Sequence, residues 1–189
     1  MTSTKQLLKP TLFTTIGGSG SSKSHFTSLL AKEIQVVRLN NDAMRSAPFD
    51  EPTLLENLHN YRLVYGAMDY AAKASLKAGA SVIYDANVNQ RVYRHKNAEL
   101  AANEGADAIV LWIKTPFEVR GERVTNRDVT DEQSRFGEDT VRKHLNQLEE
   151  PDDTEKVIII DGTANAEEQI KQFWQQYLSL QEVRSLYVS

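Results

Sequence analysis

A glycine-rich segment between an apolar run and a helical pattern constrains the fold of this chain more than any other feature. Its letters are GGSGSSKS, residues 17–24; the apolar run 12–16 precedes it and a helical pattern over 25–33 follows it. A strand, a glycine-rich turn ending in Lys-Ser and a helix together predict a loop that binds phosphate, because glycines let backbone N–H groups face an anion. The helix N-terminus adds unpaired donors and a positive dipole end. A flexible Gly/Ser loop that happens to contain a lysine is the alternative, and the flanking strand and helix argue against it.

One position of this loop is irregular. Glycine usually stands immediately before the lysine of such a loop, whereas this chain has Ser22 before Lys23. If Ser22 adopts a positive φ, serine there costs on the order of 1 kcal/mol relative to glycine. We expect either a tolerated variation or an altered nucleotide affinity.

Composition limits the class of protein. The 189 residues are 40% hydrophobic and 25% charged, as expected for one soluble globular domain spanning 1–189. The absence of cysteine excludes disulfides, zinc-thiolate sites and thiol catalysis. A net charge of −4 gives no general attraction for nucleic acid. No apolar run approaches the roughly 20 residues that span a bilayer, so we expect a cytoplasmic enzyme with no membrane contact; the oligomeric state stays open.

Short apolar runs alternate with helical patterns along the whole chain. The expected strands are Thr11–Ile16, Gln35–Leu39, Ser81–Tyr84, Ala108–Ile113 and Lys156–Ile160. The expected helices are His25–Glu33, Pro52–Lys77, Val92–Asn103, Pro116–Arg127, Glu138–Glu149 and Ala166–Leu178. This alternation predicts an α/β fold with a parallel sheet covered by helices on both faces. Ligands of such sheets bind beyond the carboxyl ends of the strands.

Two carboxylates follow the second and third expected strands. Asp42 is a candidate general base for phosphoryl transfer, and Arg45, three residues on, would share its helical face and clamp an anionic group of an acceptor. An equally weighted alternative is that Asp42 is a helix N-cap and Arg45 is a surface residue. Asp85 stands where a nucleotide site places its acidic residue near Mg²⁺, and it would otherwise hold Arg45 or cap a turn.

Three arginines follow the fourth expected strand. Arg123 and Arg127 are four residues apart and share a helical face, whereas Arg120 is expected to be a solvated side chain. The polar segment after them lacks periodicity, which predicts a lid over about 127–137 that brings Arg123 or Arg127 to the transferring phosphate.

These residues resemble a known family. The loop is similar to that of adenylate-kinase-like kinases. Asp42 with Arg45, Asp85 with Asn87, and Arg123 with Arg127 more closely resemble P-loop kinases of the polynucleotide kinase and zeta-toxin type, a group that includes predicted ATP-binding AAA-domain kinases. The resemblance runs from Thr11 to about Phe173. It implies a three-layer P-loop NTPase fold, like that of nucleoside-monophosphate kinases, with a five-stranded parallel sheet and a small lid.

The resemblance also implies roles for individual residues. ATP and Mg²⁺ are the implied cofactors. Lys23 would hold the β- and γ-phosphates, Asp42 would be the base, and Arg123 or Arg127 would act from the lid. Arg45, Asn87 and Asp42 would contact the acceptor, while Ser24 and Asp85 would hold the metal. The loop residues implied to bind ATP are Gly17, Gly18, Ser19, Gly20, Ser21, Ser22, Lys23, Ser24 and His25.

Three functions follow from this reading. The first is an ATP-dependent kinase for a hydroxyl on a small-molecule or nucleotide-like acceptor. The second is a nucleic-acid 5′-hydroxyl kinase, against which the acidic balance and the lack of a basic patch with interleaved aromatic residues argue. The third is a non-catalytic ATP-binding module, which the irregular Ser22 leaves open. The sequence does not identify the acceptor.

Overall fold

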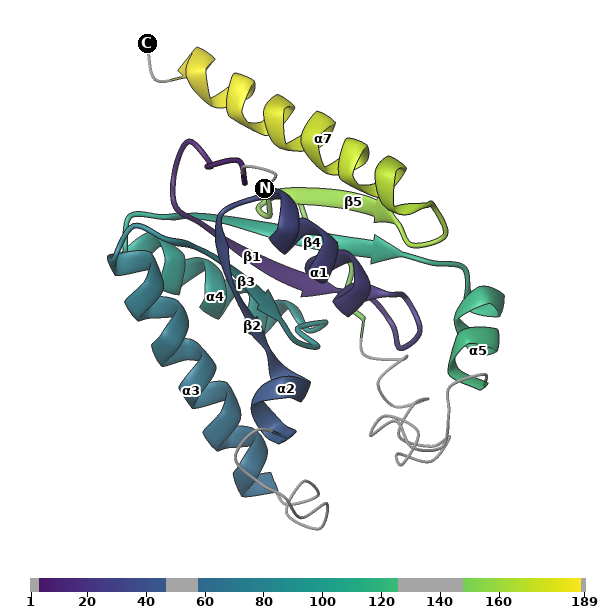
Figure 1. Cartoon of the computed structure of the whole chain (residues 1–189). Coiled ribbons are helices and arrows are strands. Elements are labelled where there is room, and N and C mark those ends of the chain that lie inside the picture. Colours follow the sequence, from purple (N-terminus) through teal and green to yellow (C-terminus); the bar gives the residue numbers. More distant parts are fainter. Residues whose placement is uncertain (1–3, 47–57, 126–147, 188–189) are drawn as a thin grey trace.

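A five-stranded parallel sheet forms the centre of the molecule (Figure 1). The computed structural model describes residues 4–46, 58–125 and 148–187. The spatial order of the strands is β2-β3-β1-β4-β5, so the first strand lies in the middle. The strands are β1 (Thr11–Ile16), β2 (Val36–Asn40), β3 (Ser81–Asp85), β4 (Asp107–Lys114) and β5 (Val157–Asp161). All five expected strands are confirmed, with ends that differ by one residue at most.

Helices connect the strands and cover both faces of the sheet. They are α1 (Lys23–Glu33), α2 (Asn41–Ser46), α3 (Leu58–Lys77), α4 (Arg91–Asn103), α5 (Phe117–Thr125) and α7 (Ala166–Tyr187). The last helix is longer than its apolar pattern predicted. Of the expected helix 138–149, residues 148 and 149 are not helical and the rest lies outside the described residues. The expected lid at 127–137 and the start of the helix expected at 52 also lie outside them. Among the described helices, none is long and apolar enough to cross a membrane.

The apolar core lies in two layers, one on each side of the sheet. On one side, α1 and α7 pack Phe26, Leu30, Phe173 and Tyr177 over the sheet. On the other side, α3 contributes Met68 and Leu76 and α4 contributes Ala101, and these pack against Leu12, Val82 and Tyr84. Alternate residues of β1 point to opposite layers, since Leu12 and Phe13 are both fully buried. β1 is buried on both faces, which is why it carries no charged residue.

The two outer strands are less buried than the sequence suggested. Only alternate residues of β5 are buried, and β2 is partly exposed because each lies at an edge of the sheet. The edge of β5 is covered by α7: the Gln176 side chain exchanges two hydrogen bonds with the backbone of Ile159, at 2.8 and 2.7 Å. Gln172 accepts a third from the Asp161 N–H at 2.9 Å. These side chains form hydrogen bonds with backbone groups of the edge strand that would otherwise be free to pair with a strand of another molecule.

A buried ion pair links α4 to the segment before β5. Arg94 donates two hydrogen bonds to the Glu155 carboxylate, at 2.6 and 2.9 Å, and a third to the Asn89 carbonyl oxygen at 2.6 Å. Burial by itself would raise the pKa of the Glu155 carboxyl, but the bonds from Arg94 and from the Asp152 N–H outweigh it and hold the pKa below the ordinary value. The charged form of Glu155 is therefore part of the folded structure.

We expect Glu155→Gln to lower the free energy of unfolding at neutral pH by about 3 kcal/mol, because it leaves the buried Arg94 cation without a counter-charge. A carboxyl whose pKa is depressed by folding contributes stability above its unfolded pKa and loses it as the pH falls. The wild type should therefore lose stability between about pH 5 and pH 3 more steeply than the variant. Urea unfolding at neutral and acidic pH measures both effects.

Glu168→Gln is the matched control. Glu168 pairs with Lys171 at an exposed position of α7, and its replacement should cost less than about 0.5 kcal/mol. Equal losses in the two variants would contradict the assigned role of the Arg94–Glu155 pair.

Candidate phosphate-binding and phosphoryl-transfer site

The glycine-rich loop turns directly after β1 and is fixed at its first residue. The Gly17 N–H donates to Asn89 Oδ1 at 3.0 Å, and Asn89 Nδ2 donates back to the Gly17 carbonyl oxygen at 3.4 Å. A turn closes the loop through the Ser21 N–H and the Gly18 carbonyl oxygen. The Lys23 ammonium folds back over the loop and donates to the carbonyl oxygens of Gly17 and Gly18, at 2.7 and 3.2 Å. Lys23 is thus positioned at the loop, as the motif predicts.

The carbonyl oxygen of Arg120 in α5 packs directly on Gly20. Gly20 has φ +78°, and a Cβ atom there would lie 2.6 Å from that oxygen. The backbone conformation therefore disfavours a side chain at this position, and the contact with the Arg120 carbonyl oxygen leaves no room for one. Ser22, the irregular residue, has φ 71° and ψ 27°, which is the left-handed conformation considered from the sequence.

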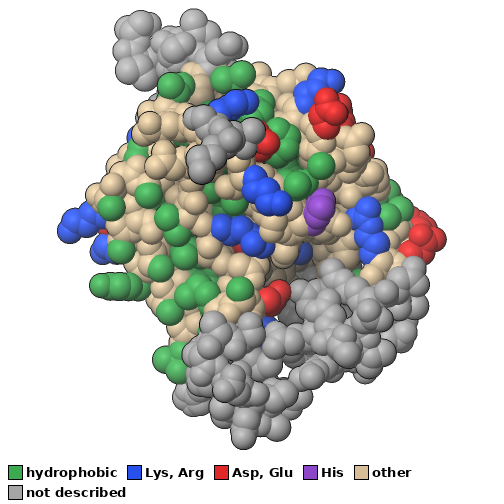
Figure 2. Space-filling view, viewed as in Figure 1, with side chains coloured by type: hydrophobic (Ala, Val, Ile, Leu, Met, Phe, Trp, Pro, Cys, Tyr) green, Lys and Arg blue, Asp and Glu red, His purple; other side chains and the backbone are tan. Residues whose placement is uncertain are grey.

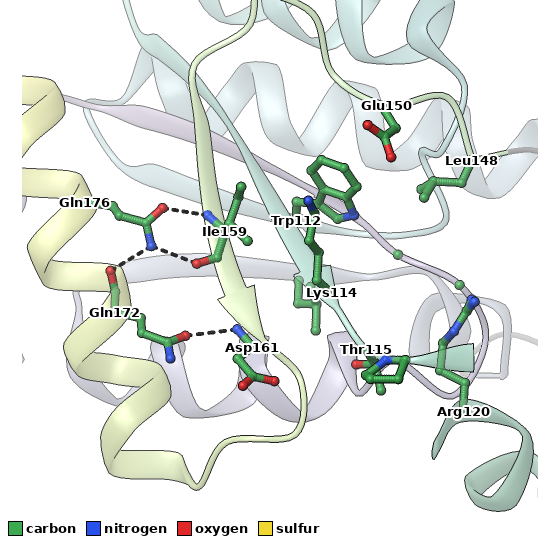
Figure 3. A pocket seen from close by; sticks show the side chains of 14 residues that line it. Trp112, Lys114, Thr115, Arg120, Leu148, Glu150, Ile159, Asp161, Gln172 and Gln176 are labelled. Atoms are coloured by element: carbon green, nitrogen blue, oxygen red, sulfur yellow. Dashed lines mark hydrogen bonds between the residues drawn. The ribbon is translucent and has the colours of Figure 1, made fainter. Parts of the chain in front are cut away.

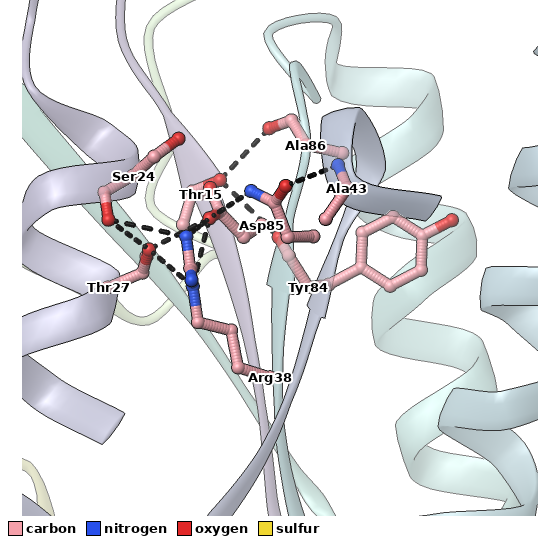
Figure 4. A network of polar contacts seen from close by, with 9 residues as sticks. Thr15, Ser24, Thr27, Arg38, Ala43, Tyr84, Asp85 and Ala86 are labelled. Atoms are coloured by element: carbon pink, nitrogen blue, oxygen red, sulfur yellow. Dashed lines mark hydrogen bonds and ion pairs between the residues drawn. The ribbon is translucent and has the colours of Figure 1, made fainter. Parts of the chain in front are cut away.

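A network around Asp85 joins three elements at the carboxyl end of the sheet (Figure 4). Asp85 is buried, and its Oδ2 accepts hydrogen bonds from Thr27 of α1 at 2.8 Å and from Arg38 and Asn40 of β2. Asn40 approaches at 2.7 Å, and Arg38 forms an ion pair with the same oxygen. Arg38 also donates to the Ser24 carbonyl oxygen at 3.3 Å. The cation on Asp85 is therefore Arg38, whereas the sequence suggested Arg45.

Asn40 also sets the start of α2. Its Oδ1 accepts a hydrogen bond from the Ala43 N–H at 2.7 Å, the geometry of a helix N-cap. The alternative that Asp42 is the cap is therefore wrong. Asp42 lies in the first turn, about half exposed, and forms an ion pair with the buried Arg45 at 3.6 Å on one face of the helix, as the spacing predicts.

A cavity of about 700 Å³ opens beside the loop (Figure 3). Gly17 and Gly18 border it, with Lys114, Trp112 and Asp161 from the neighbouring strands. The Lys114 ammonium lies 3.7 Å from the centre of the Trp112 ring. Arg120 also lines the cavity and its Nε is buried, so it is not the solvated side chain that was expected. An arginine at this position adds positive charge next to the phosphate loop.

Positive side chains also gather elsewhere near the site. Figure 2 shows Lys and Arg side chains and a histidine near the middle of the face on which α1 lies, while apolar side chains are scattered over the rest of that face. At the loop itself lie Lys23, Arg120 and Arg123, although the whole chain carries −4. Binding an anion requires only such local placement.

The structure brings most of the predicted site residues to one end of the sheet. Ser24 and His25 are exposed in the first turn of α1, and Arg123 contacts the loop from α5. Asn87 is exposed after β3, and the residue that reaches the loop from that segment is Asn89. Arg127 lies outside the described residues.

Sequence reasoning missed Arg38 and Asn89. The signal for Arg38 was a single charge flanked by apolar residues within the strand, VVRLN. Asn89 carried no signal that set it apart from Asn87, because both are asparagines in the same turn.

The donor set near Ser24 fits a magnesium ion. Mg²⁺ takes oxygen ligands and usually keeps several waters, so one hydroxyl and one carboxylate suffice. The Ser24 hydroxyl is exposed at the end of the loop, and the bonds that Asp85 accepts within the described residues all end on Oδ2. Ser24 and Asp85 are therefore the residues that would hold the ion, with Asp85 acting through its Oδ1 atom.

A parallel sheet with a glycine-rich loop between its central strand and the following helix is the arrangement of a P-loop domain. The chain belongs to the AAA domain family, which matches residues 12–151. A comparison with curated proteins gives no match.

Solved structures of kinases share the fold. A gluconokinase from Sinorhizobium meliloti superposes with a TM-score of 0.71 at 16% identity, covering 95% of this chain and 98% of that one. An unliganded sugar kinase from a Janibacter species gives 0.68 at 18% identity, with 89% and 94% covered. An APS kinase from Mycobacterium tuberculosis, in complex with AMPPNP and APS, gives 0.64 at 16% identity, with 89% and 98% covered.

We expect Gly20→Ala to lower the free energy of unfolding by about 2–4 kcal/mol, because the methyl group would meet the Arg120 carbonyl oxygen in a left-handed backbone. Thermal and urea unfolding measure the loss. The control is Gly66→Ala. Gly66 lies in α3, and a Cβ atom there would meet no other atom within 4 Å, so alanine should stabilise the helix by up to about 1 kcal/mol. A neutral Gly20→Ala would show that α5 does not pack on the loop as described.

Proposed function

We propose that the protein transfers the γ-phosphate of ATP to a hydroxyl group of a small-molecule acceptor. The observation that carries the proposal is the Asn40 side chain. It joins Asp85, beside the nucleotide loop, to the N-terminus of α2, which carries Asp42 and Arg45. A carboxylate on a separate helix next to a phosphate loop is the arrangement that phosphoryl transfer to a hydroxyl needs.

In this proposal the loop binds the nucleotide. The Gly17 and Ser21 N–H groups are already bonded within the protein. The other N–H groups of the loop and those of the α1 N-terminus would contact the phosphates, and the Lys23 ammonium would exchange its carbonyl partners for phosphate oxygens. The Ser24 hydroxyl and, through water, Asp85 would hold Mg²⁺, which neutralises charge on the phosphates when bound.

Asp42 would act as the general base. Its carboxylate takes the proton of the acceptor hydroxyl while the oxygen bonds to the γ-phosphorus. The bond from that phosphorus to the bridging oxygen breaks, and ADP leaves. Arg45, buried and held 3.6 Å from the Asp42 carboxylate, would keep that group oriented and add a positive charge beside the acceptor.

A small acceptor is favoured over a nucleic acid. Proteins of the same fold include a gluconokinase, a sugar kinase and an APS kinase, whose named substrates are small and polar. The acidic chain, with a pI of about 5.6, offers little general attraction to a polyanion. Sugars, sugar acids and nucleotide-like compounds are therefore the first acceptors to test.

We expect Mg²⁺·ATP to raise the melting temperature of the wild type and to be consumed in the presence of the right acceptor. Lys23→Ala should abolish both effects. Asp42→Asn should keep the ATP-induced shift but lower turnover by about 10²- to 10⁴-fold, because it removes the base and preserves the shape of the side chain. An ATP-consumption screen across sugars, sugar acids, nucleosides and 5′-hydroxyl oligonucleotides provides the measurement.

Each outcome of this screen decides a separate point. No thermal shift with millimolar ATP would reject the nucleotide site. A shift without turnover on any acceptor class would favour a non-catalytic binding module. Turnover that survives in Asp42→Asn would remove Asp42 from the role of base, and turnover on oligonucleotides alone would reject the small acceptor.

A further inference from the structure

Ser22 uses its hydroxyl in an unusual way for a residue that begins a helix. It is the N-cap of α1, yet its side chain makes no capping bond to the helix. A serine N-cap normally accepts a hydrogen bond from a first-turn N–H group and has an extended backbone. Ser22 instead has a left-handed backbone, and its Oγ accepts a hydrogen bond from Nη1 of Arg123 at 2.9 Å.

Arg123 connects the loop to two other segments. Its Nη1 donates to the Gly162 carbonyl oxygen at 2.9 Å and approaches the Gly20 carbonyl oxygen at 3.5 Å. The half-buried guanidinium, which extends from α5, therefore contacts both the phosphate loop and the turn after β5. All three acceptors on Nη1 are neutral, so these bonds orient the cation. The nearby Asp161 carboxylate, whose pKa is lowered by the side-chain hydrogen bond from Thr163 and also by the Arg123 charge, is an opposite charge beside it.

Glycine at position 22 would adopt the left-handed conformation at no steric cost. It would also leave Arg123 without its side-chain acceptor on the loop. The serine thus accepts an unfavourable backbone conformation and supplies a hydrogen bond that glycine lacks. This exchange makes sense if the position of the arginine matters to the site.

We propose that Ser22 is a positioning residue for the nucleotide: it holds the Arg123 guanidinium over the phosphate loop, where that cation contacts a phosphate of a nucleoside triphosphate. The inference rests on the proposed nucleotide site and adds a residue to it. Ser22, the irregular residue, then contributes to nucleotide binding, and replacing it with the usual glycine lowers the affinity of the site for the nucleotide.

The test measures the affinity of Mg²⁺·ATP by calorimetry in the full chain. Ser22→Ala removes the hydroxyl and keeps Cβ, and we expect about tenfold weaker binding, the usual effect of losing a hydrogen bond to a charged group. Ser22→Gly should weaken binding similarly although it relieves the backbone, and it keeps the test valid should Ser22→Ala fold poorly. Ser22→Asn tolerates a left-handed backbone and restores an acceptor, so it should bind within about threefold of the wild type.

Arg123→Met completes a double-mutant cycle. If Ser22 acts through the arginine, Ser22→Ala in the Arg123→Met background should cause no further loss of affinity. The same two substitutions without nucleotide should lower the melting temperature by less together than the sum of their separate shifts, because they remove one contact.

The failures of the two proposals are distinguishable. A wild type that does not bind ATP rejects the nucleotide site and this inference with it. A wild type that binds ATP, with Ser22→Gly binding as tightly or with additive losses in the cycle, overturns the inference alone. If Ser22→Ala and Ser22→Gly both lose affinity for ATP and Ser22→Asn does not recover it, the inference is also overturned. A hydrogen-bond acceptor at position 22 would then not be enough to restore binding.

Discussion

The central place of β1 in the sheet is the constraint on which the site depends. Parallel strands end at the same edge, so a loop that follows the middle strand has neighbours on both sides. The turn after β3 supplies Asn89 to the first glycine, and α5 after β4 places its backbone against Gly20. The turn after β5 also contacts the loop, because its Gly162 packs against Thr115 and the Ser21 carbonyl oxygen. A glycine-rich loop is intrinsically mobile, and these contacts from three sides give it one conformation.

Two buried carboxylates near the loop, Asp85 and Glu155, are each paired with an arginine. Asp85 and Glu155 are both carboxylates removed from water, and each accepts hydrogen bonds from an arginine and from a neutral donor. An unpaired charge in such a place would cost several kcal/mol. The Arg94–Glu155 pair also reaches the site indirectly. Arg94 fixes the carbonyl group of Asn89, and the side chain of Asn89 fixes Gly17. Stability of the outer sheet and geometry of the loop are therefore coupled.

Local pattern was enough to predict the strands and the loop, because each depends on residues adjacent in sequence. The partner of Asp85 was not predictable in this way. Arg38 and Arg45 both precede Asp85, and only the register of β2 against β3, which pairs Asn40 with Asp85, decides which arginine reaches it. The choice between Asn87 and Asn89 likewise depends on the path of a turn, and Asn89 faces the loop while Asn87 is exposed. Arg120 was misjudged because its side chain lines the cavity beside the loop, which periodicity within the helix does not reveal.

Ser22 combines an unfavourable backbone conformation with a hydrogen bond to a residue distant in sequence. The left-handed conformation costs about 1 kcal/mol for a non-glycine residue, a small part of the roughly 5–15 kcal/mol by which a domain is stable. The fold therefore tolerates serine there without any compensating contact, and tolerance alone would explain its presence. The hydrogen bond to Arg123 makes that explanation incomplete. A serine that was merely tolerated would direct its hydroxyl to water or to the helix N-terminus, whereas this hydroxyl is committed to a cation from another element, beside the loop that binds phosphate.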